Sequence, residues 1–189
     1  MCGIKKTSPA FTLLEILVAL AIIAIISMVV VPNFRRTTPM EERKAFITSL
    51  NSLVQFAWQQ ALQQRKVAQV TFDFKKEMVS IGLATNKQDQ KGNTVFAPIT
   101  GAFLNTAISW PDAYVVRQFF IEGFDEMKRY SGRQAAEMWF YIIPDGLAQS
   151  VIINMVDEKD IRDGKPLTIG LVLNPFMPQF VAYDEFQKP

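Results

Sequence analysis

The sequence predicts an α+β fold in which a long N-terminal helix packs on an antiparallel β-sheet domain. Three observations predict it. Residues 11–31 form an apolar run, residues 39–64 repeat their apolar side chains at helical spacing, and from Val67 onward the apolar period approaches two. A chain of 189 residues has room for one domain and an anchor. We therefore expect an apolar helix over 11–31, an amphipathic helix within 32–66 and a β-rich domain over 67–189.

The first element, residues 11–31, is long enough to cross a membrane. Its only charged residue is Glu15, and at about 1.5 Å per residue a helix of this length covers roughly 30 Å, the thickness of a bilayer core. A cleavable secretory signal is the alternative, since Lys5 and Lys6 precede the run. However, the run is about twice as long as the apolar region of such a signal, and no small-residue cleavage site closes it. We expect a single transmembrane helix.

Charge alone gives only a weak indication of how this helix is oriented. Basic residues lie on both sides of it, and their balance mildly favours a cytoplasmic C-terminal domain. Those residues are Lys5, Lys6, Arg35, Arg36, Arg43 and Lys44.

A carboxylate inside an apolar helix needs an explanation. At the centre of a membrane it costs roughly 2.5–3.5 kcal/mol on insertion scales, but Glu15 lies near the start of the helix, where the helix dipole lowers this cost. The side chain either reaches the water at the membrane surface or seeks a partner of opposite charge. An ionisable residue in such a segment is a functional hypothesis by default.

The residues around this carboxylate match a known family. A short basic leader, the small residue Ala10, the sequence Phe-Thr-Leu-Leu-Glu at residues 11–15 and a long apolar helix resemble the N-terminus of type IV pilins and of type II secretion pseudopilins. The resemblance implies that residues 1–10 are a leader peptide, that a prepilin peptidase cuts between Ala10 and Phe11, and that Phe11 is then N-methylated. The family usually has Gly where this chain has Ala10. It also places the following domain in the periplasm, and we follow it in preference to the flanking charges.

The resemblance also implies a role for Glu15 in subunit assembly. In an assembled fibre its carboxylate would neutralise the new amino group of Phe11 on a neighbouring subunit, because an unpaired buried charge costs several kcal/mol. Removal of residues 1–10 would take away Cys2 and two lysines, which leaves 18 basic residues, 18 acidic residues and no Cys. Many pilins have a C-terminal disulfide loop, so a chain without Cys favours a pseudopilin.

A second helix is expected from Pro39 to Gln64. Pro32 removes a helix donor and is expected to kink or end the first helix. Residues 38–41, Thr-Pro-Met-Glu, then have the form of a capping box with Pro at the first helical position. The second helix would turn one apolar face toward the core, formed by Phe46, Leu50, Leu53, Val54, Ala57, Ala61 and Leu62.

Several later segments have the alternation of strands. Val67–Phe74 and Met78–Leu83 predict a hairpin. Asp125–Tyr130 is expected to form a helical turn, and Pro144-Asp145-Gly146 a tight turn in which Pro presets φ and Gly accepts a positive φ. The other expected strands are Tyr114–Glu122, Trp139–Ile143, Val151–Val156, Leu167–Leu173 and Gln179–Phe186.

Two connections are expected to be loops. Residues 84–113 are rich in Asn, Gln, Thr, Gly and Pro, and either a subunit contact or a simple insertion would explain a loop of this length. Residues 157–164 are expected to form a solvated hairpin turn. A Ca²⁺ site is the alternative there because carboxylate oxygens suit that ion, but the spacing is not that of an EF-hand loop. The carboxylates are Asp157, Glu158, Asp160 and Asp163.

A few further residues are candidates for contacts or chemistry. Trp58, Trp110 and Trp139 are candidate contact anchors, although Trp139, within an apolar strand, is expected in the core. Asp184 and Glu185 are adjacent, so on a strand their side chains would face opposite sides and would not form an acid–base pair. Asp145 is expected only to shape its turn.

Composition excludes several classes of function. The chain has no His, and its one Cys is Cys2. Ser-His and Cys-His catalysis, imidazole zinc sites, disulfide scaffolds and CxxC redox chemistry are therefore excluded. The formal net charge of +2 gives no electrostatic reason to expect nucleic-acid binding. We expect no metal, no cofactor and no enzymatic activity; a membrane-anchored enzyme would have to use carboxylates, Lys or a Ser-Lys pair.

A looser resemblance covers much of residues 44–156. An Ala- and Gln-rich helix, a Val-Thr-Phe-Asp-Phe hairpin and an Ile-x-Pro-Asp-Gly turn resemble the H-type minor pseudopilins (GspH) and the related FimT/FimU minor pilins. This implies a pilin-like fold and a structural subunit at or near the tip of a type II secretion pseudopilus, which drives protein export across the outer membrane. A minor pilin of a type IV pilus or DNA-uptake pilus is the alternative.

The same resemblance implies partners and a location. The partners would be other pseudopilins, major and minor, through the N-terminal helix, together with the prepilin peptidase and the inner-membrane secretion platform. The protein would cross the bacterial inner membrane once, with its C-terminal domain in the periplasm, and would enter the periplasmic pseudopilus on assembly.

Overall fold

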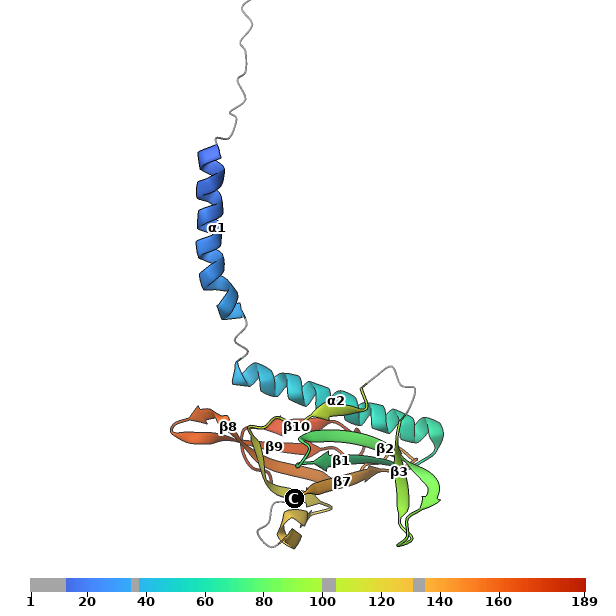
Figure 1. Cartoon of the computed structure of the whole chain (residues 1–189). Coiled ribbons are helices and arrows are strands. Elements are labelled where there is room, and N and C mark those ends of the chain that lie inside the picture. Colours follow the sequence, from blue (N-terminus) through green and yellow to red (C-terminus); the bar gives the residue numbers. More distant parts are fainter. Residues whose placement is uncertain (1–12, 35–37, 100–104, 131–134) are drawn as a thin grey trace, which may run out of the picture. The chain divides into compact units, whose positions relative to one another are not determined.

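The computed structural model describes residues 13–34, 38–99, 105–130 and 135–189, with only the backbone described for residues 29–34. The chain divides into two compact units, residues 1–38 and residues 39–189 (Figure 1). The first contains helix α1, and the second contains helix α2 and all the strands. Each unit is described by itself.

The first unit is built on a single helix. α1 spans Leu13–Phe34, so Pro32 lies within the helix, which ends two residues later. Within the described residues, no helix is both long enough and apolar enough to span a membrane.

The expected amphipathic helix is confirmed with the predicted bounds. α2 spans Pro39–Gln64 and has Glu41 and Glu42 in its first turn, where the helix dipole favours acidic side chains. Six of the seven predicted core residues are buried, and Phe56 joins them, whereas Leu62 remains 37% exposed. The buried residues are Phe46, Leu50, Leu53, Val54, Phe56, Ala57 and Ala61.

The first sheet, sheet A, contains the predicted hairpin. β1 (Ala68–Asp73) pairs antiparallel with β2 (Met78–Gln88) on one side and with β7 (Glu137–Ile142) on the other. The strand order is β3-β2-β1-β7, and β4 also pairs with β2. Alternate residues of β1 are fully buried, as its sequence alternation predicts. The other two strands are β3 (Thr94–Pro98) and β4 (Ala107–Ser109).

The second sheet, sheet B, has the order β10-β9-β8-β5-β6, again antiparallel. The strands predicted to begin near residues 114, 151, 167 and 179 all lie in this sheet, so these predictions are confirmed. The predicted helical turn is a 3-10 helix, η1 (Glu126–Tyr130). The strands are β5 (Tyr114–Ile121), β6 (Phe124–Asp125), β8 (Val151–Arg162), β9 (Lys165–Leu173) and β10 (Phe180–Tyr183).

Both segments contain more strand than predicted, and the predicted hairpin between residues 151–156 and 167–173 is confirmed. Within residues 84–113, β2 continues to Gln88 past a register shift and pairs with β3, and β4 follows. In residues 157–164, β8 and β9 continue to a two-residue turn in which Asp163 (φ 51°) and Gly164 (φ 74°) are both left-handed. Such a turn matches the twist of a hairpin. These additional strand residues were not predicted because their side chains are mostly polar and lie outside the core, so the sequence shows no apolar alternation there.

One core unites the helix and the two sheets. α2 contacts β1, β2 and β7 of sheet A and β8 and β10 of sheet B (Figure 1). Phe72 of β1 packs edge-to-face on Phe119 of β5 at 5.4 Å between ring centroids, and Phe46 of α2 packs on Trp110 at 5.3 Å. Such pairs add to the stabilisation from burial alone. The predicted α+β class, with a helix packed on antiparallel sheets, is confirmed.

Candidate functional site

The predicted processing site lies outside the described residues. Ala10 and Phe11, the expected cleavage and methylation positions, belong to residues 1–12, of which no structure is described. Glu15 is described: it lies in the first turn of α1, and its side chain is exposed. The structure therefore places Glu15 at the start of the apolar helix, where the sequence predicted it.

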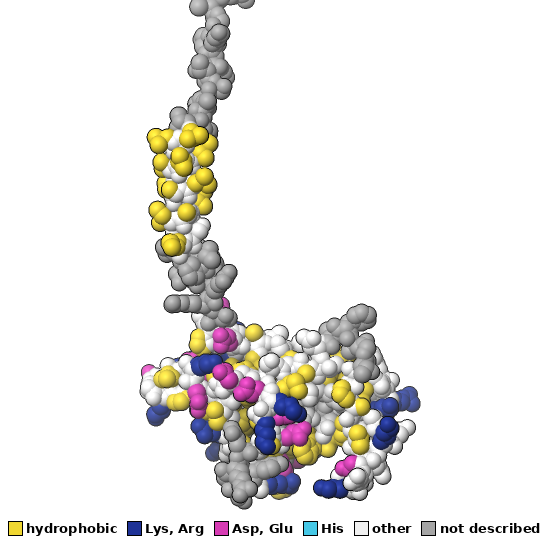
Figure 2. Space-filling view, in the orientation of Figure 1, with side chains coloured by type: hydrophobic (Ala, Val, Ile, Leu, Met, Phe, Trp, Pro, Cys, Tyr) yellow, Lys and Arg dark blue, Asp and Glu magenta, His cyan; other side chains and the backbone are white. Residues whose placement is uncertain are grey.

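α1 presents apolar side chains on all sides. Every described side chain from Leu13 to Met28 is exposed, and Figure 2 shows hydrophobic side chains along this helix. Leu13 is 79% exposed and Ile25 is 67% exposed. An apolar surface of this extent marks a site of contact with protein or lipid.

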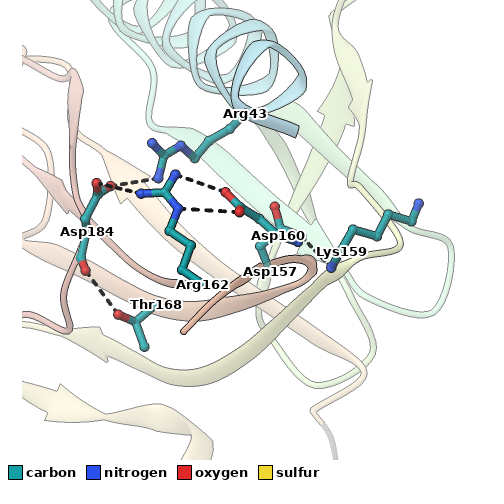
Figure 3. A network of polar contacts seen from close by, with 7 residues as sticks. All are labelled: Arg43, Asp157, Lys159, Asp160, Arg162, Thr168 and Asp184. Atoms are coloured by element: carbon teal, nitrogen blue, oxygen red, sulfur yellow. Dashed lines mark hydrogen bonds and ion pairs between the residues drawn. The ribbon is translucent and has the colours of Figure 1, made fainter. Parts of the chain in front are cut away.

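In the second unit, a polar cluster joins three distant segments (Figure 3). Arg43 of α2 donates to Asp184, which follows β10, at 2.7 Å, and Arg162 of β8 lies 3.7 Å from the same carboxylate. Arg162 also pairs with Asp160 at 3.1 Å. The side chain of Arg43 is only 11% exposed, so its aliphatic part packs while its charge is paired. Neither Asp184 nor Glu185 lies in a strand, because β10 ends at Tyr183.

Two acidic residues of the β8–β9 hairpin, Asp157 and Asp160, make structural contacts. Asp157 is 3% exposed, and its carboxylate accepts the backbone N–H groups of Lys159 and Asp160 at 2.9 and 3.3 Å. The expectation of a solvated turn is therefore wrong for Asp157. Lys159 binds Asp112 at 2.8 Å, and this hydrogen bond lowers the pKa of the Asp112 carboxyl. In the parts of the chain that are described, no three His, Cys, Asp or Glu residues are grouped to hold a metal ion.

The C-terminal segment, residues 184–189, packs on the outer face of sheet B. Asn154 of β8, fully buried, hydrogen bonds the main chain of Gln187, and Thr168 of β9 donates to the carbonyl of Asp184. Gly170 allows the close approach: a Cβ there would lie 2.5 Å from the carbonyl oxygen of Glu185. The sequence signals of this contact are a polar residue and a glycine inside two apolar strands, and neither was among the predicted site residues.

The three tryptophans lie in different environments. Trp110 is buried, and Trp58 donates from its indole Nε1 to the carbonyl of Gly146 at 2.8 Å. Gly146 has φ 85°, which confirms the predicted turn, and Asp145 beside it is exposed. Trp139 is 40% exposed, so the prediction that it lies in the core is wrong. Its neighbours Met138 and Phe140 occupy the core side of β7, and alternation turns Trp139 outward.

Comparisons with known proteins agree with the N-terminal pattern. Residues 5–31 match a family model described as the prokaryotic N-terminal methylation motif. A search of curated protein sequences finds no significant match.

Two solved structures of a minor pseudopilin, EpsH from the type 2 secretion system of Vibrio cholerae, are similar to this chain. One has a TM-score of 0.48 and 9% identity, over 74% of this chain and 94% of its own. The other has a TM-score of 0.44 and 12% identity, over 70% of this chain and 93% of its own.

The segment matched by the family model contains the positions on which the sequence resemblance rested. Ala10, Phe11 and Glu15 all lie within residues 5–31. Beyond this segment, the second unit has the predicted α+β architecture. The chain thus carries the N-terminal methylation motif of prepilin-like proteins at residues 5–31, as its sequence predicted.

Proposed function

We propose that this protein is a minor pseudopilin of a type II secretion system. It would be a structural subunit at or near the tip of the periplasmic pseudopilus that drives protein export across the outer membrane. The observation that carries the proposal is the N-terminal methylation motif at residues 5–31. An apolar helix with exposed side chains and a separate β-rich unit follow the motif, which is the order that an assembling subunit needs.

The processing steps follow from the motif. A prepilin peptidase cuts between Ala10 and Phe11 and methylates the new amino group of Phe11. Before assembly, residues 11–31 anchor the chain in the inner membrane and the β-rich unit lies in the periplasm. The run contains a single charged residue, Glu15, and one carboxylate near the end of a membrane span is tolerated.

Assembly follows from the exposed apolar surface of α1. The inner-membrane secretion platform would present the subunit to the growing pseudopilus, where α1 packs among the helices of other pseudopilins. There the carboxylate of Glu15 neutralises the methylated amino group of Phe11 on a neighbouring subunit, because a buried charge without a partner is strongly unfavourable. The work is mechanical, and the β-rich unit needs no catalytic group for it.

A minor pilin of a type IV or DNA-uptake pilus, of the FimT/FimU kind, is the second candidate, because pilins share the motif. The mature chain would contain no Cys, and this favours the pseudopilin. Deletion of the gene separates the two: loss of exoprotein secretion supports the pseudopilin, whereas loss of twitching, adhesion or transformation supports the pilin.

The direct test is the intact mass of the membrane-extracted protein, expressed with and without its prepilin peptidase. The expected result is loss of residues 1–10 and gain of one methyl group only when the peptidase is present. An uncut chain would indicate an ordinary membrane-anchored protein, and a cut near Pro32 an ordinary secreted protein; either result would contradict the proposal. A catalytically inactive peptidase, expressed to the same level, is the matched control.

A further inference from the structure

The outer face of sheet A differs from that of sheet B. Sheet B is covered by the C-terminal segment, residues 184–189, whereas the outer face of sheet A borders an open groove of about 810 Å³. β7 and β3 supply most of its aromatic lining, and the tip of the β2–β3 hairpin closes one side. The lining includes Gln69, Asn93, Phe96, Glu137, Trp139 and Tyr141.

The groove has an aromatic floor. Phe96 of β3 stacks on Tyr141 of β7, with ring centroids 5.5 Å apart and planes inclined by 25°. Trp139, two residues before Tyr141 on the same face of the strand, is 40% exposed. Exposed, preorganised aromatic side chains are the residues that most often dominate binding energy at protein interfaces.

The edge of β7 offers main-chain hydrogen bonds. Tyr141 turns its backbone groups away from β1: its N–H donates to Oε1 of Gln149 at 2.8 Å, and its carbonyl accepts the N–H of Gln149 at 3.1 Å. Because backbone groups alternate along an antiparallel strand, those of Trp139 and Glu137 face the same way. Among the described residues, none hydrogen bonds the outward backbone groups of Trp139 and Glu137. A hollow of about 240 Å³, between β7 and η1, lies beside this edge, and its lining includes Trp139, Gln149 and the ion pair of Arg129 with Glu126.

The charge on this face is negative. Glu137 lies opposite Asp73 across the β1–β7 ladder, and like charges in this position repel. Lys76 is bound to Asp73 at 2.9 Å and also feels the charge of Glu137, but Glu137 has no ion pair of its own among the described residues. In an antiparallel pair, directly opposite side chains have Cβ atoms about 4.5–5.5 Å apart. A strand added to β7 would therefore place its residue opposite Trp139 within reach of both the indole ring and the Glu137 carboxylate.

We propose that the outer edge of β7 at Glu137 and Trp139 is a docking site for an extended segment of a partner protein. The segment adds to sheet A as a further antiparallel strand, and a Lys or Arg side chain of it lies over Trp139 beside Glu137. Main-chain hydrogen bonds supply affinity. The cation–π contact with the Trp139 ring, together with the nearby carboxylate of Glu137, selects a basic residue. This inference goes beyond the proposed function: it concerns the β-rich unit alone and holds whichever machine the protein serves.

The test is titration of the full chain, in detergent micelles, with a short basic peptide. The probe is acetyl-Thr-Val-Arg-Val-Thr-amide, which alternates like a strand. The chain has three tryptophans, so the ¹H–¹⁵N spectrum contains three indole signals, and Trp139→Phe assigns the relevant one. We expect the Trp139 signal to shift, with a dissociation constant on the order of 1 mM for so short a peptide. The signals of Trp58 and Trp110 should stay in place.

Two substitutions and two altered peptides test each part of the proposal. Trp139→Ala should weaken binding about fivefold, measured on backbone signals of β7, and Glu137→Gln about threefold. A peptide with Glu in place of Arg should bind much more weakly. So should one N-methylated at Arg and at both Thr residues, because those are the N–H groups that would face β7. Phe176→Ala and Glu158→Gln remove an exposed aromatic ring and an exposed carboxylate elsewhere, and should change nothing.

Other outcomes would overturn the proposal. These are a Trp139 signal that no peptide moves, equal binding of the Arg and Glu peptides, and equal binding of the N-methylated peptide. A shift caused instead by chitotriose would make the groove a carbohydrate platform. A Trp139 signal that changes with protein concentration alone would make it a contact between copies of this chain. None of these results depends on cleavage at Ala10, so a failure here is distinguishable from a failure of the proposed function.

Discussion

The side chain of Asn154 and the main chain of Gln187 hydrogen bond each other in both directions. The amide Nδ2 donates to the carbonyl of Gln187 at 2.8 Å, and the N–H of Gln187 donates to Oδ1 at 2.9 Å. The second hydrogen of Nδ2 goes to Oε1 of Gln118. Asn51 of α2 binds the main chain of Phe180 in the same two-way manner. Two asparagine side chains thus hydrogen bond the main chain of the C-terminal part, in the way that a neighbouring strand would.

Replacement of Asn154 should therefore loosen the C-terminal segment. Asn154→Ala removes three hydrogen bonds from a fully buried position and leaves Gln187 without these partners. We expect the free energy of unfolding to fall by about 2–3 kcal/mol, measured by urea denaturation. Asn105→Ala, at an exposed position, is the matched control and should have little effect. An Asn154→Ala protein as stable as the parent would show that the pair contributes nothing net.

A methyl group at position 170 should displace the same segment. The Cβ of Gly170→Ala would lie 2.5 Å from the carbonyl oxygen of Glu185, closer than any real contact. We expect a loss of about 1–3 kcal/mol in the free energy of unfolding, as for other overpacked sites. In a chain truncated after Asp184, Glu185 and Gln187 are absent and the added Cβ approaches only Oδ1 of Asn154, at 3.3 Å, so the substitution should cost less there. An equal cost in both chains would place the strain in β9 itself.

The stability of the second unit should decrease at alkaline pH through Tyr114. This side chain is 6% exposed, and burial, aided by the charge of Asp157, raises the pKa of its phenol to about 12 from 10.0. Because the folded pKa is the higher one, the stabilisation is complete below about pH 10 and is lost as the pH rises toward about 12. Tyr114→Phe should remove this part of the pH dependence of urea unfolding. Tyr183→Phe, at a 42% exposed position, should keep it.

The sequence predicted most of this fold because the core positions repeat regularly. The bounds of α2 followed from a proline, a capping pattern and helical spacing. The β1–β2 hairpin followed from alternation, since one face of each strand is buried. Where both faces of a strand are mostly solvated, as in the distal part of the β2–β3 hairpin, alternation vanishes and the segment resembles a loop.

The errors at the candidate sites have particular causes. Residues 139–143 are apolar without a break, so their sequence does not show which face turns inward, and Trp139 was assigned to the wrong side. The role of Asn154 required knowing that residue 187 returns to β8, a long-range contact that no local pattern contains. The N-terminal motif, by contrast, is local, so it was predicted from consecutive residues.

Substitution at the processing junction should speed cleavage or leave it unchanged. Gly is the residue that prepilin-like proteins usually have where this chain has Ala10, so we expect Ala10→Gly to be processed at least as fast. The measurement is the fraction of cut chain against time, by intact mass, in cells with the peptidase. Ala10→Val, with a branched side chain at the same place, is the control and should be cut more slowly. Slower processing of Ala10→Gly would mean that the junction lies elsewhere.

Neutralisation of Glu15 should separate processing from assembly. Glu15→Gln keeps the size of the side chain but removes the charge that would balance the methylated amino group of Phe11 on a neighbouring subunit. We expect cleavage and methylation to remain largely intact by mass, whereas cross-linking to other pseudopilins and exoprotein secretion fall at least tenfold. That factor corresponds to a loss of about 1.4 kcal/mol in assembly, well within the cost of a buried charge without its partner.

The control for this prediction retains the charge. Glu15→Asp keeps a carboxylate on a shorter side chain and should restore part of the assembly that Glu15→Gln loses, because the charge remains within reach of its partner at reduced strength. If both variants secreted normally, the carboxylate would have only an interfacial role at the start of α1. If both were uncut, Glu15 would act in recognition by the peptidase, and the defect would come before assembly. The combination of normal mass, lost cross-linking and partial rescue is the result that the charge-pair mechanism requires.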